Sequence, residues 1–472
     1  MENLQEAFQR LEQSAKAIQQ SKKNIKKEIE TIRYLAQVFL LNFNQFNDVL
    51  DNRQRHSLIQ MLHSHFMGSF DKDSVAILVE RLKQSLLLLE KQASKMVLNP
   101  TKSALPISIQ GLTIYNYYNI KSAGLSIPLN ASFVALTGNN AEGKTRILKA
   151  IGESFYMPES SAYDFKGQKC LLIFNVKVAN RLSTSIIDGI KNWWTMVQHQ
   201  NKVVAYGASR LQLQSSESQD VQNLKKSNVY NLFHNESTLL NIEHWFKIQK
   251  LKQEEARIQA VKHLLIELMP TIQDIQMGVK TTRLSDYAIT YIENGKELLS
   301  EELSAGNKSI LAMIGDMLIR LYDAQPEMIE PNQLAGIVLI DELEVHLHPI
   351  WQKKLPQLLV KHFPLVQFIV STHSPIVFLG MPPDTILFNI SKDEAGETLI
   401  QKINIDLANV LPNQILTSAL FGMENIRNVY NQDIQQLSVE TEPEIKARQM
   451  AEEQLKKRSQ NFTFKLPSND KN

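Results

Sequence analysis

Cysteine is nearly absent from this chain of 472 residues, since Cys170 is the only one. A single cysteine excludes an intrachain disulfide framework and any zinc site built on several thiolates. Basic and acidic residues are almost balanced, at 51 and 49, so the net charge is only +2. Bulk positive charge therefore cannot bind nucleic acid here, and any such contact must come from a local patch.

Long apolar runs are absent as well. Runs such as residues 38–41 and 86–89 are far shorter than the roughly 20 residues that cross a bilayer. The first residues, Met-Glu-Asn-Leu-Gln, are polar and acidic, unlike a secretory signal. We therefore expect a cytoplasmic protein with no membrane partner.

Glycine and proline are nearly missing from the first 98 residues, where Gly68 is the only residue of either type. Apolar residues recur there at heptad spacing over seven repeats, broken only by Lys22. This pattern predicts an all-helical coiled-coil domain over residues 1–98, with one long helix from about Glu2 to Asp48. The heptad seam either packs inside the chain as a bundle or forms an intermolecular coiled coil, and both alternatives stay open.

Two more helices are expected in this domain. One runs from about Asn52 to Met67, just before Gly68. The other begins at Asp73 or Ser74, since either residue is a good N-cap, and runs to about residue 97. Residues 99–106 contain two prolines and form a linker.

Beyond the linker, a buried strand (132–137) runs into a glycine-rich turn and then into a helix (146–151). The turn, residues 138–145, reads Gly-Asn-Asn-Ala-Glu-Gly-Lys-Thr and matches the phosphate-binding P-loop pattern. Glycines let backbone N–H groups point at phosphate oxygens, and a helix N-terminus favours negative charge. The residues expected to bind the nucleotide here are Gly138, Asn139, Asn140, Ala141, Glu142, Gly143, Lys144, Thr145 and Arg146.

A second motif follows almost two hundred residues later. Residues 336–342 form an apolar run that ends in two carboxylates, Asp341 and Glu342. A continuous Ile/Val/Leu run suits a strand buried on both faces of a parallel sheet. Together the motifs predict an ATP site in which Lys144 neutralises phosphate charge, Thr145 and Asp341 hold Mg²⁺, and Glu342 polarises the attacking water.

Strands and helices alternate along the rest of the chain, which predicts an α/β nucleotide-binding core with an antiparallel edge. The expected strands are 107–114, 125–129, 170–176, 203–206, 272–279, 286–293 and 367–372, and the expected helices are 236–270, 304–322 and 350–362. Residues 443–460 read as a charged helix, followed by a disordered tail.

Two further motifs narrow the class of ATPase. Residues 303–309, Leu-Ser-Ala-Gly-Asn-Lys-Ser, resemble the signature sequence of ABC-type ATPases. The resemblance implies that Ser304 and Gly306 meet the γ-phosphate held by a second subunit. Residues 371–375, Ser-Thr-His-Ser-Pro, resemble the switch segment of the same class, and imply that His373 contacts the γ-phosphate and acts in catalysis.

The segment 341–349, Asp-Glu-Leu-Glu-Val-His-Leu-His-Pro, resembles soluble ABC ATPases of the RecF/OLD/SMC kind. The layout of the motifs, together with residues 411–423, is similar to that of the Septu-type ATPases of bacterial anti-phage systems, which also occur with retrons. This resemblance implies an ABC-type ATPase head, a mixed sheet flanked by helices, over residues 107–440. A helical insertion at about 236–270 belongs to it, and a C-terminal helix and tail occupy 441–472.

The resemblance also implies a function. It predicts an ATP-binding and ATP-hydrolysing subunit that dimerises around ATP and Mg²⁺ and controls a separate nuclease of the HNH type, with DNA as a further candidate partner. Two alternatives remain. One is a RecF-like DNA-repair ATPase, and the other is a nucleotide-gated scaffold with negligible hydrolysis.

Some residues depart from the family pattern or have two interpretations. Asn307 replaces a frequent Glu or Gln after the signature, and the contact of the family's Q-loop with Mg²⁺ falls on either Gln212 or Gln214. Arg210 is an alternative phosphate ligand. By the same resemblance, His346 and His348 belong to the D-loop, which faces the dimer partner, and not to a metal site.

Overall fold

The computed structural model describes residues 4–20, 26–68, 71–93, 104–139, 141–153, 155, 170–178, 181–188, 193–194, 200–210, 227–234, 237–279, 287–394, 396–405 and 407. The P-loop residue Asn140, both Q-loop candidates (Gln212 and Gln214) and residues 411–472 lie outside these ranges. None of the helices within them combines the length and apolar character that crossing a bilayer requires.

The central sheet has six strands in the order β14-β13-β3-β12-β11-β7. Five of them are parallel, and β14 pairs antiparallel with β13 at one edge. The strands are β3 (Phe133–Thr137), β7 (Val203–Tyr206), β11 (Gly336–Ile340), β12 (Val366–Ser371), β13 (Ile386–Lys392) and β14 (Thr398–Ile403). The predicted mixed sheet flanked by helices is confirmed.

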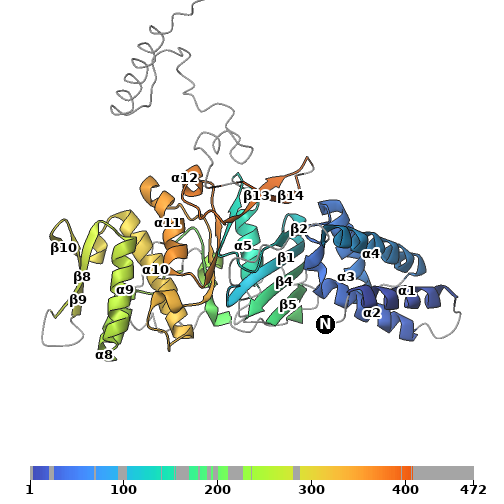
Figure 1. Cartoon of the computed structure of the whole chain (residues 1–472), viewed down its shortest axis with the longest axis horizontal. Coiled ribbons are helices and arrows are strands. Elements are labelled where there is room, and N and C mark those ends of the chain that lie inside the picture. Colours follow the sequence, from blue (N-terminus) through green and yellow to red (C-terminus); the bar gives the residue numbers. More distant parts are fainter. Residues whose placement is uncertain are drawn as a thin grey trace, which may run out of the picture. The chain divides into compact units, whose positions relative to one another are not determined.

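Both faces of the central sheet are buried, which explains why its strands read as continuous apolar runs. Along β3, Phe133 and Ala135 belong to one core, whereas Val134 and Leu136 belong to another. The first core also includes side chains of the short helix α12 (Pro375–Phe378) and of four longer helices (Figure 1). These are α8 (Ile242–Leu251), α9 (Glu255–Leu268), α10 (Ala305–Ala324) and α11 (Pro349–His362).

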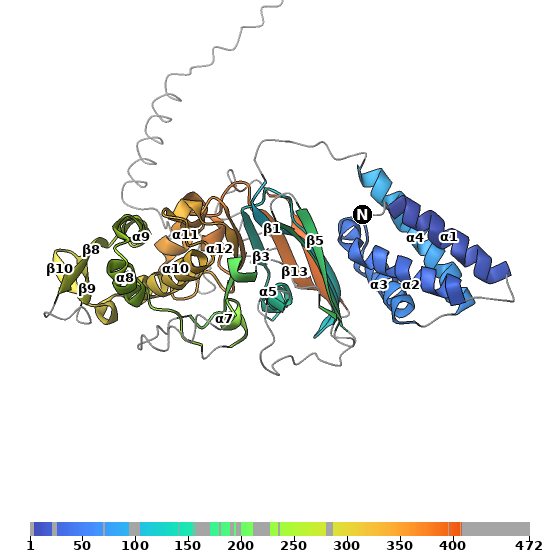
Figure 2. The ribbon, with the colours of Figure 1, turned by 90° about the horizontal axis from the view of Figure 1, so that it is seen from below.

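The second core lies between the central sheet, α5 (Lys144–Glu153) and an antiparallel sheet of order β2-β1-β4-β5-β6 (Figure 2). Its strands are β1 (Ile107–Tyr117), β2 (Ile120–Ser126), β4 (Leu171–Val178), β5 (Arg181–Asp188) and β6 (Trp193–Trp194). The expected strand 125–129 was wrong by several residues. The chain reverses close to Tyr118, which takes a φ of 52° without any glycine or proline to mark the turn.

The two sheets are joined by a buried amide. Gln367 on β12 has no exposed surface. Its side chain accepts a hydrogen bond from the backbone N of Ile109 (2.7 Å) and donates to the carbonyls of Ile109 (3.2 Å) and Ala131 (3.1 Å). The β1–β4 register shifts at this same point, so the side chain satisfies backbone groups near an irregular stretch of the sheet.

A third, small sheet pairs β8 (Ile272–Val279) with β9 (Tyr287–Glu293) and β9 with β10 (Lys296–Leu298). The expected strand pair thus forms. Outside the N-terminal region, the other helices that the structure describes are short. They are α7 (Tyr230–Phe233), α12 (Pro375–Phe378), and the 3-10 turns η1 (Phe43–Phe46), η2 (Gln200–Lys202), η4 (Ser300–Glu302) and η5 (Pro331–Gln333).

The N-terminal region contains four helices: α1 (Leu4–Gln20), α2 (Lys26–Leu41), α3 (Asn52–Met67) and α4 (Lys72–Ala93). The expected single helix from Glu2 to Asp48 is therefore wrong, because α1 and α2 are separate and pack against each other. Lys22, which breaks the heptad pattern, falls in residues 21–25, outside the described ranges. The seam residues Leu11, Ile18 and Phe39 are buried within this one chain, as the bundle alternative requires.

Helix α3 has the predicted bounds. The Asp51 carboxylate accepts from the backbone N of Gln54 (2.8 Å), whose own side chain accepts from Asp51 N (3.2 Å), a capping box. Gly68 ends the helix with a φ of 98°. Helix α4 starts slightly earlier than expected because Asp71, rather than Asp73 or Ser74, accepts from the first turn.

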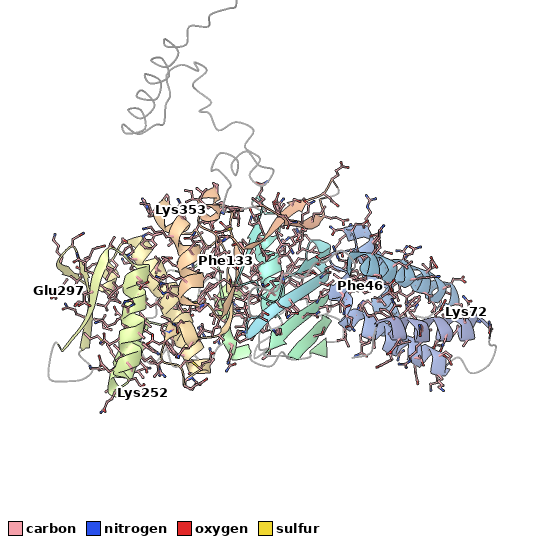
Figure 3. The ribbon with its side chains drawn as sticks, in the orientation of Figure 1. Phe46, Lys72, Phe133, Lys252, Glu297 and Lys353 are labelled. Atoms are coloured by element: carbon pink, nitrogen blue, oxygen red, sulfur yellow. The ribbon has the colours of Figure 1, made fainter. Side chains whose placement is uncertain are left out.

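The bundle is attached to the antiparallel sheet by two buried asparagines beside η1. Asn47 Nδ2 donates to the carbonyls of Leu112 (3.1 Å) and Leu125 (3.2 Å), and Asn44 Nδ2 donates to that of Ile173 (3.3 Å). Phe46, between the two asparagines, is fully buried in the bundle, whereas Phe133 lies in the central sheet (Figure 3). Buried amides without these carbonyl partners would cost about 1–3 kcal/mol each, so the contact is specific.

We predict that Gly124→Ala loosens this attachment, because a Cβ built there would lie 2.2 Å from Asn47 Oδ1. Overpacking of this kind should lower the free energy of unfolding by about 1–3 kcal/mol. Gly278→Ala is the matched control, since the added Cβ meets nothing within 4 Å in another strand. Chemical denaturation followed by circular dichroism measures both, and equal stability of the two variants would contradict the attachment.

Candidate nucleotide site

Three candidate segments follow strands β3, β11 and β12, which are adjacent and parallel. The P-loop comes after β3, the acidic pair after β11, and the segment containing His373 after β12. The carboxyl ends of parallel strands meet at one edge of a sheet, where open α/β folds bind ligands. The topology therefore brings the three segments together, although more than two hundred residues separate the first from the last.

The P-loop has the left-handed backbone that its glycines permit. Gly138 has a φ of 138° and Gly143 a φ of 115°, and Ala141 between them has a φ of 65°. A Cβ at position 138 would lie 2.0 Å from the carbonyl oxygen of Ile390, so close packing as well as conformation requires glycine there.

Lys144 folds back over the loop that precedes it. Its Nζ donates to the carbonyl oxygens of Gly138 and Asn139, both at 2.7 Å. Burial lowers the pKa of this amine, while nearby carboxylates, Glu142 foremost, oppose the change. The ammonium is thus held at the loop by carbonyls that phosphate oxygens would replace as its partners.

Glu142 has a structural task that the sequence did not reveal. Its carboxylate accepts from the backbone N of Asn139 (2.5 Å) and from the Asn139 side chain (3.2 Å). Its carbonyl accepts from the hydroxyl of Thr398 on β14 (3.3 Å). Glu142 therefore ties the first half of the P-loop to the second, and the loop to the edge of the sheet.

Thr145 and Asp341 lie in direct contact. The Thr145 hydroxyl donates to Asp341 Oδ2 (2.8 Å), and the hydroxyl of Ser371 donates to Asp341 Oδ1 (2.5 Å). A hydroxyl and a carboxylate are oxygen donors that suit Mg²⁺. The residues present therefore fit the implied metal, and Ser371 is a contributor that the sequence had not singled out because serine at a strand end is common.

An open pocket of about 220 Å³ lies over these groups. Its described lining residues are Ala141, Gly143, Lys144, Thr145, Arg146, Asp341 and Glu342. Arg146 also places its guanidinium 5.7 Å from the ring centre of Tyr118. The pocket thus combines P-loop backbone, two cations and the acidic pair.

The signature residues do not line this pocket of their own chain. Ser304 is the exposed N-cap of α10, and its hydroxyl accepts from the backbone N of Asn307 (3.3 Å). A Cβ added at Gly306 would lie 3.8 Å from the carbonyl oxygen of His346, so the start of α10 lies beside the D-loop. The structure therefore places the signature with the D-loop and not with the pocket.

Arg210 binds backbone carbonyls and not phosphate, so the alternative that it is a phosphate ligand is removed. We call this arrangement the clamp. The Arg210 guanidinium is 1% exposed and donates to four carbonyl oxygens. These belong to Gly207 (3.1 Å), Asp341 (2.7 Å), Glu342 (2.6 Å) and Leu343 (3.2 Å). Burial lowers the pKa of Arg210 to about 10, against the charges of Glu344, Asp341 and Glu342. The clamp fixes the turn that carries the acidic pair.

Among the described residues, no group of three or more His, Cys, Asp or Glu side chains lies close enough together to hold a metal ion. His348 caps α11, with Nδ1 accepting from the backbone N of Ile350 (3.4 Å). His373, in the switch segment, lies with Nδ1 2.7 Å from Glu344 Oε1. That contact joins the switch segment to the D-loop.

The chain is similar to several known proteins over part of its length. Residues 193–379 match a family described as "AAA domain, putative AbiEii toxin, Type IV TA system". The "Retron Vc95 probable ATPase" of Vibrio cholerae serotype O1 biovar El Tor is 37% identical over 135 residues, 29% of this chain and 26% of that protein. The "Septu protein PtuA" of Bacillus mycoides (strain KBAB4) is 24% identical over 345 residues, 67% of this chain and 45% of that protein.

The matched parts span less than half the length of these curated relatives. Among solved structures, an Smc head domain with an extended coiled coil, bound to a ScpA domain derived from Pyrococcus furiosus, aligns with a TM-score of 0.42 and 14% identity over 64% of this chain and 98% of that chain. The resemblance to Septu and retron ATPases that the motifs indicated is confirmed by the named relatives.

We predict that Arg210→Lys lowers the free energy of unfolding by about 2–3 kcal/mol, because an ammonium cannot reproduce the guanidinium fork and leaves buried carbonyls unpaired. Arg53→Lys, at an exposed position on α3, is the matched control and should be neutral. Equilibrium denaturation measures both. A fully stable Arg210→Lys protein would show that the clamp is dispensable.

Proposed function

We propose that this chain is the ATP-binding and ATP-hydrolysing subunit of a bacterial anti-phage defence complex, that it dimerises around ATP, and that it controls a separate nuclease of the HNH type. The observation that carries the proposal is the hydrogen bond between Thr145 and Asp341 at the base of a P-loop pocket. The retron and Septu names of the relatives support the biological setting.

The site residues take their roles from position and chemistry. Lys144 and the backbone of residues 138–145 bind the phosphates, with Arg146 at the pocket wall. Thr145 and Asp341 hold Mg²⁺, which when bound neutralises charge on the phosphate oxygens. Glu342 also lines the pocket, with its backbone N anchored on the Ser371 hydroxyl (2.8 Å), so its carboxylate is placed to orient water.

The dimer follows from the separation between the signature and its own pocket. The exposed Ser304 hydroxyl and the N-terminus of α10 are suited to bind anionic oxygens, but they do not line the pocket of the same chain. A second copy supplies a pocket for them. Two protomers related by a two-fold axis then enclose two ATP molecules, each held by Lys144 of one chain and by Ser304 and Gly306 of its partner.

Complementation between two inactive variants tests this arrangement. Lys144→Ala removes the phosphate cation, and Ser304→Asp keeps a good N-cap while placing negative charge against the γ-phosphate. Each variant alone should release almost no phosphate from ATP. A mixture should recover about a quarter of wild-type activity, because half of the dimers are mixed and each of these has one intact site.

Phosphate release by the mixture shows whether the signature completes the pocket of its partner or that of its own chain. Each variant alone is the control. If the signature served the pocket of its own chain, every protomer in the mixture would carry a defect and activity would stay at background. Inactive wild-type protein would instead favour a nucleotide-gated scaffold.

Co-expression with the product of the adjacent gene tests the control of an effector. We expect one complex on gel filtration whose nuclease activity changes when ATP is added, since ATP selects one dimer state. Lys144→Ala should abolish that change. A complex whose nuclease activity ignores ATP, or two proteins that never co-elute, would contradict the proposal.

A further inference from the structure

Glu344 is a third carboxylate in the segment that carries Asp341 and Glu342. It is only 6% exposed, and it is not among the described residues that line the pocket. Its Oε1 accepts from the backbone N of His373 (2.7 Å) and lies 2.7 Å from Nδ1 of the same residue. One buried carboxylate oxygen thus contacts both the main chain and the imidazole of His373.

The turns that carry the two residues are fixed to each other. The backbone N of Leu343 donates to the carbonyl of Ser371 (3.0 Å). Gln352 bridges the same turns, with Nε2 donating to the carbonyl of Glu344 (3.5 Å) and Oε1 accepting from the Ser374 hydroxyl (2.7 Å). The contact between Glu344 and His373 is therefore part of a built junction rather than a chance surface pair.

The charge of Glu344 is held in place by the clamp described above. Burial lowers the pKa of Arg210, and Glu344 is the carboxylate that opposes this change most. Arg210 is itself buried and donates to the carbonyls of the same turn. The buried guanidinium therefore supplies opposite charge to the buried carboxylate of Glu344.

The contact decides which nitrogen of His373 carries the proton. A carboxylate can only accept hydrogen bonds, so Nδ1 must donate. Nε2 is then the ring atom left for a ligand, and the imidazole side chain is 46% exposed.

We propose that Glu344 is a positioning residue for ATP hydrolysis, because its carboxylate holds His373 with Nδ1–H toward the protein and Nε2 toward the γ-phosphate. The inference rests on the proposed function. It gives each carboxylate of the acidic segment a separate role: Asp341 holds the metal, Glu342 orients the water, and Glu344 positions His373.

A double-mutant cycle tests whether Glu344 acts through His373. Glu344→Gln replaces a carboxylate that can only accept with an amide that can also donate, so the Nδ1–H tautomer of His373 is no longer fixed, and kcat should fall about 10- to 100-fold. KM for ATP should stay within about twofold, because Glu344 does not line the pocket. His373→Ala should give a similar loss, and the double variant should be no worse than His373→Ala within about twofold.

The controls separate this role from simple stabilisation. Glu255→Gln, on the surface of α9, removes one negative charge far along the chain and should leave kcat unchanged. Glu344→Asp keeps the charge but withdraws the carboxylate, and the same cycle run with it serves if the Gln variant is poorly folded. Denaturation midpoints of all variants are measured in parallel.

The outcomes distinguish the two levels of the argument. Wild type that releases no phosphate overturns the proposed function, and the inference with it. If the wild type is active but the kcat losses of the Glu344 and His373 variants multiply in the double variant, the inference alone is overturned. The same holds if either substitution leaves kcat unchanged. Equal, non-additive losses in kcat at unchanged KM support it.

Discussion

The hydrogen bond between Thr145 and Asp341 is the contact around which the nucleotide site is arranged, because it joins the start of α5 to the residue that follows β11. Ser371, from the strand between them, completes the group by donating to the same carboxylate. This convergence is possible only because β3, β12 and β11 run parallel and end at one edge. The strands are buried on both faces, so the apolar core and not the site itself holds that edge in register.

Carboxylates are concentrated in the turn after β11, and such a turn would repel itself without a buried cation. Arg210 supplies that cation from the segment after β7, which is the next strand of the sheet. Its fork binds backbone carbonyls, which leaves the carboxylates of Asp341 and Glu342 free to face the pocket. Glu342 lines the pocket, whereas Glu344 is buried outside its described lining and contacts His373, so one short turn gives the two carboxylates different partners.

The helical bundle is connected to the same site through ordinary structural contacts. Asn52, at the start of α3, donates to the carbonyl of Thr398 (3.4 Å), and the Thr398 hydroxyl donates to the carbonyl of Glu142 in the P-loop (3.3 Å). Lys121 on β2 and Glu397 beside that threonine form an ion pair. Thr398 on the edge strand β14 therefore contacts both the bundle and the phosphate-binding loop.

Elements whose conformation depends on neighbouring residues could be predicted from the sequence. The glycine-rich turn, the apolar strand ending in Asp341 and Glu342, and the capped helix α3 were predictable because backbone conformation and strand burial there depend on neighbouring residues. The tertiary structure alone decided what depends on distant partners. The heptad pattern could not reveal that α1 and α2 fold onto each other, since the same apolar stripe serves either pairing. The sequence also could not show that Arg210 clamps a turn or that Glu344 holds His373, because those contacts join segments 29 or more residues apart.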